Sequence, residues 1–84
     1  MVTPSDKALP NPKIKLVPCK SSNIHGVGYD ASSRVMEIIF HGGGKYRFYG
    51  IPPIIWENLI HAKSMGNYFG TVIRGGGFKY KKLA

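Results

Sequence analysis

Residues 24–50 read IHGVGYDASSRVMEIIFHGGGKYRFYG and contain three runs in which apolar side chains alternate with other residues. Alternation with a period of two is typical of β-strands that bury one face. It predicts strands at residues 24–30, 34–41 and 45–50. The connections are short and rich in Asp, Ser and Gly, which are turn-forming residues. Strands this close together in the sequence predict an antiparallel meander.

The residues after the meander predict two helices and a last strand. Pro53 can begin the first helix, because proline is well tolerated at the first helical position. Ser64 is the expected N-cap of a second helix that runs to Ile73, and the glycines of residues 75–77 end it. Residues 78–83 alternate again and predict a strand. The predicted fold class is α+β, a small antiparallel sheet with two helices packed on one face, in the order β-β-β-α-α-β.

Strand alternation and helical spacing also predict the core. The side chains that we expect to be mostly buried are Val27, Tyr29, Met36, Ile38, Phe40, Tyr46, Phe48, Ile55, Trp56, Leu59, Ile60, Phe69, Val72, Ile73, Phe78 and Tyr80.

The chain is too short for two independent cores, at 84 residues and 9.3 kDa. Residues 1–20 differ in composition from the rest, because they hold four lysines and four of the six prolines, Pro4, Pro10, Pro12 and Pro18. Proline removes backbone donors and disfavours regular structure around it. We therefore expect a flexible basic arm at 1–20 and a single domain at 21–84.

The net charge of the chain indicates which kinds of partner it can bind. Twelve Lys and Arg against four Asp and Glu give a net charge of +8, which favours nucleic acid, an anionic membrane surface or an acidic protein.

The lone cysteine, Cys19, excludes an internal disulfide and a cysteine-based zinc site. The sequence has no apolar run of about 18 residues and no secretory signal, so we expect a cytoplasmic protein that does not span a membrane.

Catalytic chemistry is not expected. The carboxylates do not pair, and Asp30 is better explained as a turn residue than as an acid or base. The three histidines lie on different elements without metal-ligand spacing. The GGGK at residues 42–45 resembles a phosphate loop only superficially, because Tyr46 and a strand follow it instead of Ser or Thr and a helix. The predictions are no enzyme activity, no cofactor and no metal.

One face of the predicted sheet is basic. If Tyr46, Phe48, Phe78 and Tyr80 face the helices, alternation places their neighbours on the opposite, open face. Such a surface could neutralise phosphates and offer one stacking platform to a base. An ordinary lysine-rich face that keeps the sheet soluble remains the alternative. The predicted nucleic-acid-binding residues are Lys45, Arg47, Tyr49, Lys79 and Lys81 on that face, with Lys82 and Arg74 near the strand ends.

An ordered set of short motifs runs through residues 21–83. They are SSNI (21–24), VGYD (27–30), MxIxF (36–40), YxF (46–48), IP (51–52), LxxAxSxGxYF (59–69), IR (73–74) and FxY (78–80). Together they resemble the KTSC domain, a family named from the C-terminus of some lysyl-tRNA synthetases and also present as small stand-alone bacterial and phage proteins. The central Tyr-x-Tyr of the family is Tyr46-Arg47-Phe48 here, so a role for the second hydroxyl is absent. The resemblance makes residues 21–84 a KTSC-like domain and implies RNA binding, which has been suggested for the family.

Two classes of function stay open. The first is a binding module for RNA or other single-stranded nucleic acid that uses the basic sheet face and the arm without base-specific contacts. The second is a small protein-binding or inhibitory module, of a kind that phages encode, that docks on an acidic protein. Neither class involves a membrane or a small-molecule substrate.

Overall fold

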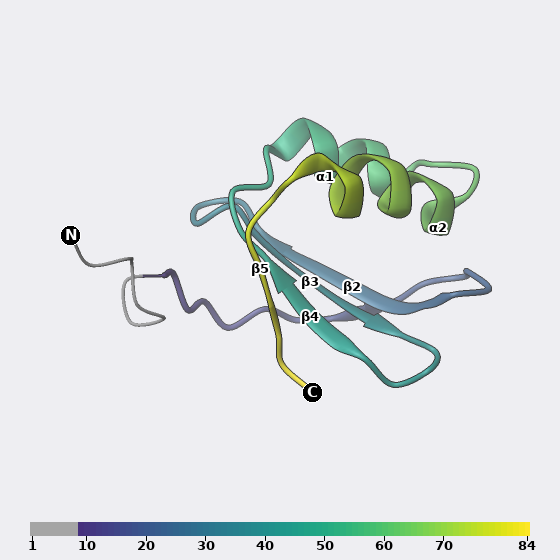
Figure 1. Cartoon of the computed structure of the whole chain (residues 1–84), viewed down its shortest axis with the longest axis horizontal. Coiled ribbons are helices and arrows are strands. Elements are labelled where there is room, and N and C mark those ends of the chain that lie inside the picture. Colours follow the sequence, from purple (N-terminus) through teal and green to yellow (C-terminus); the bar gives the residue numbers. More distant parts are fainter. Residues whose placement is uncertain (1–8) are drawn as a thin grey trace.

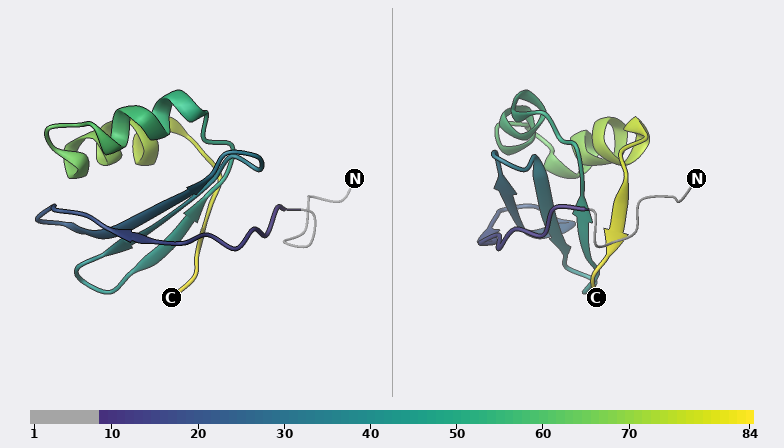
Figure 2. Two further views of the ribbon diagram at one scale, coloured as in Figure 1. Left: turned by 180° about the vertical axis from the view of Figure 1, so that it is seen from behind. Right: turned by 90° about the vertical axis from the view of Figure 1, so that its left-hand side faces the viewer.

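The computed structural model describes residues 9–84, which form a five-stranded antiparallel sheet with helices on one face (Figures 1 and 2). The strands lie side by side in chain order, and the connection between β4 and β5 holds the helices of residues 9–84. This confirms the predicted α+β class, with one further strand at the start that makes the order β-β-β-β-α-α-β. The strands are β1 (Val17–Pro18), β2 (Ile24–Asp30), β3 (Val35–Phe40), β4 (Lys45–Phe48) and β5 (Tyr80–Lys82).

Local hydrogen bonds make the two turns of the meander. Asp30 Oδ2 accepts from the backbone N–H of Ser33 at 3.1 Å and from the Ser32 hydroxyl at 3.0 Å. Hydrogen bonds from the side chains of Ser33 and then Ser32 hold the pKa of Asp30 below its usual value. At the second turn Phe40 N–H donates to Gly44 O at 2.9 Å, and Gly43 has a φ of 98°, which favours glycine. Asp30 is the turn residue that its sequence context predicts.

The helical layer begins and continues where the sequence predicts. Helix α1 (Pro53–Ile60) has proline at its first position, and Ser64 caps α2 (Met65–Tyr68) by accepting from Asn67 N–H at 3.2 Å. The chain then widens into one π-helical segment, η2 (Phe69–Ile73), and ends in a 3-10 turn, η3 (Arg74–Gly76). The predicted second helix therefore reaches Ile73, but only its first turn is α-helical.

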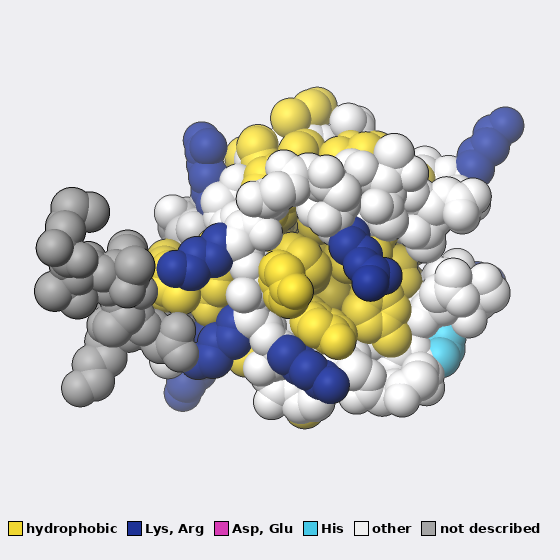
Figure 3. Space-filling view, viewed as in Figure 1, with side chains coloured by type: hydrophobic (Ala, Val, Ile, Leu, Met, Phe, Trp, Pro, Cys, Tyr) yellow, Lys and Arg dark blue, Asp and Glu magenta, His cyan; other side chains and the backbone are white. Residues whose placement is uncertain are grey.

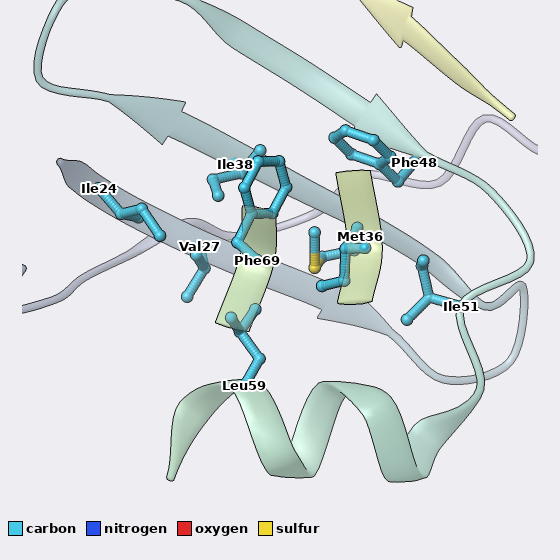
Figure 4. Close-up of a cluster of buried hydrophobic side chains, with 9 residues drawn as sticks. Ile24, Val27, Met36, Ile38, Phe48, Ile51, Leu59 and Phe69 are labelled. Carbon is cyan, nitrogen blue, oxygen red and sulfur yellow. The ribbon is translucent and has the colours of Figure 1, made fainter. Parts of the chain in front are cut away.

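The core lies between the sheet and the helices (Figure 4). Seven of its nine buried members are predicted ones, and they are joined by Ile24, the first residue of β2, and Ile51, which follows the meander. Two core predictions are wrong: Ile60 is 39% exposed at the last turn of α1, and Tyr80 is 61% exposed on β5, an edge strand with a neighbour on one side only. The buried cluster comprises Ile24, Val27, Met36, Ile38, Phe48, Ile51, Leu59, Phe69 and Ile73.

The N-terminal segment crosses the sheet on the face away from the helices (Figures 1 and 2). Val17 pairs with Val27, and Asn11 Oδ1 accepts from Arg47 Nη1 at 2.7 Å. The segment passes so close to Gly28 that a Cβ on this glycine would lie 2.5 Å from Ile14 Cγ2 and from the backbone oxygen of Lys15. Residues 11–18 of the predicted arm thus lie against the sheet, and the absence of a side chain at Gly28 leaves room for them. The rest of the predicted arm up to residue 8 lies outside the described residues.

Candidate functional site

The predicted basic face exists as a set of strand positions. Cross-strand register aligns Glu37 with Arg47 and Arg47 with Lys81, so these three side chains share the face opposite the helices. Lys45 and Tyr49 lie on the same face by alternation along β4, and Tyr49 N–H donates to Lys79 O at 2.9 Å. The sheet thus brings together cations that are far apart in the sequence, as alternation predicts.

This face is not an open array of cations, because a buried carboxylate lies within it. Glu37 is 3% exposed and accepts from Arg47 Nε at 2.8 Å, while Lys45 Nζ lies 3.8 Å from its other oxygen. Burial alone would lower the pKa of Arg47, but hydrogen bonding and charge interaction with Glu37 outweigh burial and raise it. Arg47 also donates to Asn11 of the crossing segment. Lys45 and Arg47 are therefore partly neutralised from within the protein.

Tyr49 cannot serve as the stacking platform that the sequence suggests. Its side chain is only 9% exposed, and it lies on the face that the N-terminal segment crosses. A base would need to displace protein to reach the ring. The prediction of an exposed Tyr49 is wrong because alternation assigns a residue to a face but does not show what else lies on that face.

An open cleft lies on the other side of β4 and β5, beside the helical layer. It has a volume of about 560 Å³, and Figure 3 shows a hollow of apolar side chains with Lys and Arg side chains around it. We call this the aromatic cleft. Its lining residues are Phe40, Gly42, Gly44, Tyr46, Phe48, Phe69, Arg74 and Tyr80.

The aromatic rings of the cleft contact one another in series. Tyr80 stacks on Phe48 with ring centroids 5.5 Å apart, and Phe48 meets the edge of Phe69 at 5.4 Å. The centroid of the Phe40 ring lies 5.4 Å from that of Phe69 and 5.9 Å from that of Tyr46, so the series continues to Tyr46. Such edge and offset contacts fix ring positions. The cleft wall is therefore a continuous aromatic surface, of which Tyr80 is the most exposed part.

The glycine turn between β3 and β4 keeps the cleft open. A Cβ at Gly44 would lie 3.0 Å from Tyr46 Cε1, and Gly42, which also lines the cleft, has no side chain to fill it. The sequence contained this signal, since three successive glycines beside aromatic strand residues can leave an unfilled surface. Alternation predicts Tyr46 and Tyr80 to be core residues and gives no sign of the cleft that they line.

The predicted site residues divide between these two faces. Arg74 lines the aromatic cleft and is exposed, and Lys82 pairs with Tyr46, which puts it on the cleft side of β5. Lys81 is exposed on the other side of the same strand, and Lys79, which directly precedes β5, is also exposed. Four of the seven predicted residues are thus within one short C-terminal segment that borders the cleft.

The His, Cys, Asp and Glu side chains of residues 9–84 do not form a metal-binding cluster. His25 and His41 lie with ring centroids 5.4 Å apart, a proximity that their sequence spacing does not reveal. No group of three or more His, Cys, Asp and Glu side chains that could hold a metal ion occurs in this part of the chain. Burial raises the pKa of the Cys19 thiol. Within the same residues, no helix is both long and apolar enough to cross a membrane.

Comparisons with known proteins agree with this architecture. The model of the KTSC domain family matches residues 20–80. A solved KTSC domain protein of Yersinia pestis has a TM-score of 0.80 and 35% identity, covering 86% of this chain and all of that one. An uncharacterized protein of Stutzerimonas stutzeri is 30% identical over 70 residues, which are 83% of this chain and 99% of the relative. A lysine–tRNA ligase of Nostoc punctiforme is 31% identical over 65 residues, 77% of this chain but 11% of the ligase.

Proposed function

The chain belongs to the KTSC domain family, and from this premise we propose that it is a non-enzymatic module that binds RNA. The observation that carries the proposal is the aromatic cleft with Arg74 at its wall and Lys82 on the same side of the sheet. Single-stranded nucleic acid is bound by this combination, in which cations neutralise phosphates and aromatic rings stack on bases. The proposed site is therefore the cleft and the segment that borders it, and not the open sheet face.

The distribution of charge supports a polyanionic partner. Arg74 and the three lysines of residues 79–82 lie within nine residues of sequence. The carboxylate of Glu37, which could have opposed them from β3, is buried and occupied by Arg47 and Lys45. With a net charge of +8, the field around this end of the molecule attracts phosphates.

Similarity to lysine–tRNA ligases favours RNA over DNA. The similar proteins from Nostoc punctiforme and Trichormus variabilis are named for joining lysine to tRNA, and this chain matches about a tenth of their length. The matched part is too small to carry the ligase activity to this chain. The similarity supports RNA as the partner. An RNA partner in turn agrees with the expected cytoplasmic location.

A protein partner is the second candidate, because one observation favours it. A groove of about 400 Å³ beside β1 and α1 is lined by Val17, Trp56, Ile60 and Met65, with Lys15 at its edge. Val17 is 56% exposed and Ile60 is 39% exposed, and exposed apolar groups next to a cation suit a protein surface of opposite charge. This groove is separate from the aromatic cleft, so variants of the two surfaces distinguish the two functions.

The test is a fluorescence anisotropy titration with labelled single-stranded RNA at several salt concentrations. Arg74→Ala and Lys82→Ala should each weaken binding and reduce the slope of log K against log salt by about 0.7, the change for one phosphate contact on a single strand. Lys63→Ala is the matched control, since it removes an exposed lysine between α1 and α2 that does not line the cleft. Absence of RNA binding at about 50 mM salt would reject the proposal and favour the protein partner.

A further inference from the structure

We propose that the aromatic cleft holds one unpaired base of the bound RNA, with the neighbouring phosphate beside Arg74. This inference rests on the proposed function and names the class of RNA that it recognises, a single strand with an unstacked base. The first support is the exposure of Tyr80. Its ring lies on Phe48 at an interplanar angle of 28°, yet 61% of the residue faces solvent.

Exposed aromatic surface in a cleft is costly in water and is stabilised when another flat ring covers it. Phe48 occupies one side of the Tyr80 ring, so the remaining exposed surface can receive a second ring. Tyr46 lies 6.3 Å from Tyr80, tilted by 54°, and is half-buried. These two tyrosines provide a surface for a base, with the phenylalanines behind them as support.

The size of the cleft suits a base and not a base-paired helix. Its volume of about 560 Å³ is within the range of small-ligand pockets, about 300 to 1,000 Å³. Bases inside a duplex present only their edges, because their flat faces are stacked on one another. A base must therefore leave the stack to occupy the cleft, which selects single strands.

The charge pattern fits a nucleotide better than an apolar ligand. Arg74 is the charged side chain among the described residues that line the cleft, and none of those residues is acidic. Its guanidinium can contact a phosphate while the rings contact the base. Lys82, paired with Tyr46, adds a second cation on the cleft side for the next phosphate along the strand.

The experiment compares an adenosine RNA tetranucleotide with its fully abasic counterpart, which has the same phosphates and no bases. The adenosine strand should bind about tenfold more tightly, as expected when one base stacks on an aromatic side chain. Tyr80→Leu should remove most of this difference and leave binding of the abasic strand unchanged. Tyr80→Phe, which keeps the ring, should preserve the difference. Tyr80 is exposed, so both variants should fold, which circular dichroism can verify.

A second measurement locates the base. Ring-current shifts in the NMR spectrum should appear at the amides of Gly42, Gly44 and Arg74 when the adenosine strand is added. The amides of Gly26 and Gly28, which lie against the N-terminal segment, should not shift.

The outcomes separate this inference from the proposed function. Equal, salt-dependent binding of both strands would overturn base stacking and leave RNA binding intact. Equal binding of a fully paired RNA hairpin would also overturn it. Equal binding of an adenosine DNA strand would overturn RNA as the partner and retain the base site. Failure of every strand to bind at about 50 mM salt would overturn both proposals.

Discussion

At the scale of single residues, Glu37 determines how much of the basic sheet face is available. Among the described residues it is the buried charged one, on the face away from the helices, and both Arg47 and Lys45 lie against it. A buried ion pair adds little to stability compared with an apolar pair, but removing one partner leaves an uncompensated charge. The charge that this face presents to a partner therefore depends on the Glu37 ion pairs as well as on the number of lysines and arginines.

Glu37→Gln should lower the free energy of unfolding by about 3 kcal/mol, because the largely buried Arg47 would lose its counter-charge. Urea denaturation monitored by tryptophan fluorescence measures this change. Glu57→Gln is the control, since Glu57 and its neighbour His61 are exposed and their interaction should contribute little. Equal stability of the two variants would contradict the assigned role of Glu37.

The protonation of Asp30 makes the stability of the fold depend on pH in the acid range. Its hydrogen bonds with Ser33 and Ser32 lower the pKa of the folded carboxyl below the unfolded value of about 3.9. A depressed folded pKa stabilises the fold above the unfolded pKa, and this stability is lost as the pH falls through the folded pKa. Melting temperatures of the parent and Asp30→Asn, measured from pH 7 to pH 2, should therefore differ at neutral pH and converge at low pH. A constant difference over this range would contradict the assignment.

At the scale of elements, β1 and the segment before it complete the sheet. Pro18 is tolerated because it pairs at the edge of the sheet, where a missing N–H costs little. Gly26 and Gly28 of β2 allow the close approach, since a side chain at either position would meet the backbone of the crossing segment. The two glycines of β2 are thus explained by packing.

Gly28→Ala should displace the crossing segment, because the added methyl group would lie 2.5 Å from Ile14 Cγ2 and from Lys15 O. Trypsin should then cleave after Lys13 and Lys15 faster than in the parent protein. Gly42→Ala is the matched control, since an added methyl group there meets nothing within 4 Å. Unchanged cleavage in Gly28→Ala would show that the segment does not depend on this contact.

At the scale of the whole molecule, the sheet separates two faces with different roles. The crossing segment and the Glu37 ion pairs occupy one face, while the aromatic cleft stays open between β4, β5 and the helical layer (Figure 3). The proposed site and the covered face share β4 and β5 but not their exposed side chains. Changes on one face should therefore leave the other largely unaffected.

Deletion of residues 1–16 tests this separation. The variant should be less stable, because the outer face loses its cover, and it should bind RNA more weakly because Lys7, Lys13 and Lys15 are removed. Its preference for the adenosine strand over the abasic strand should remain, since no cleft-lining residue is lost. Loss of that preference in a folded variant would place the base site on the outer face instead.

Local features of the sequence were enough to predict much of the fold. The strand at residues 24–30 has the predicted bounds, Pro53 begins α1 and Ser64 caps α2, because alternation and capping depend on residues that are neighbours in the chain. Alternation also placed cations of β4 and β5 on shared faces, because side chains two residues apart in a strand point to the same face and paired strands keep that alternation aligned.

The rest depended on contacts between distant parts of the chain. Asn11 and Arg47 are 36 residues apart, and no local pattern indicates that a proline-rich segment will cross the sheet and contact Arg47 on the face where Tyr49 is buried. Alternation likewise assigned Tyr46 and Tyr80 to the helix side, but only the position of η2 over the sheet determines how far the helices cover them. Whether a side chain is exposed is set by what packs over its face, and that is a property of the assembled layers and not of any one strand.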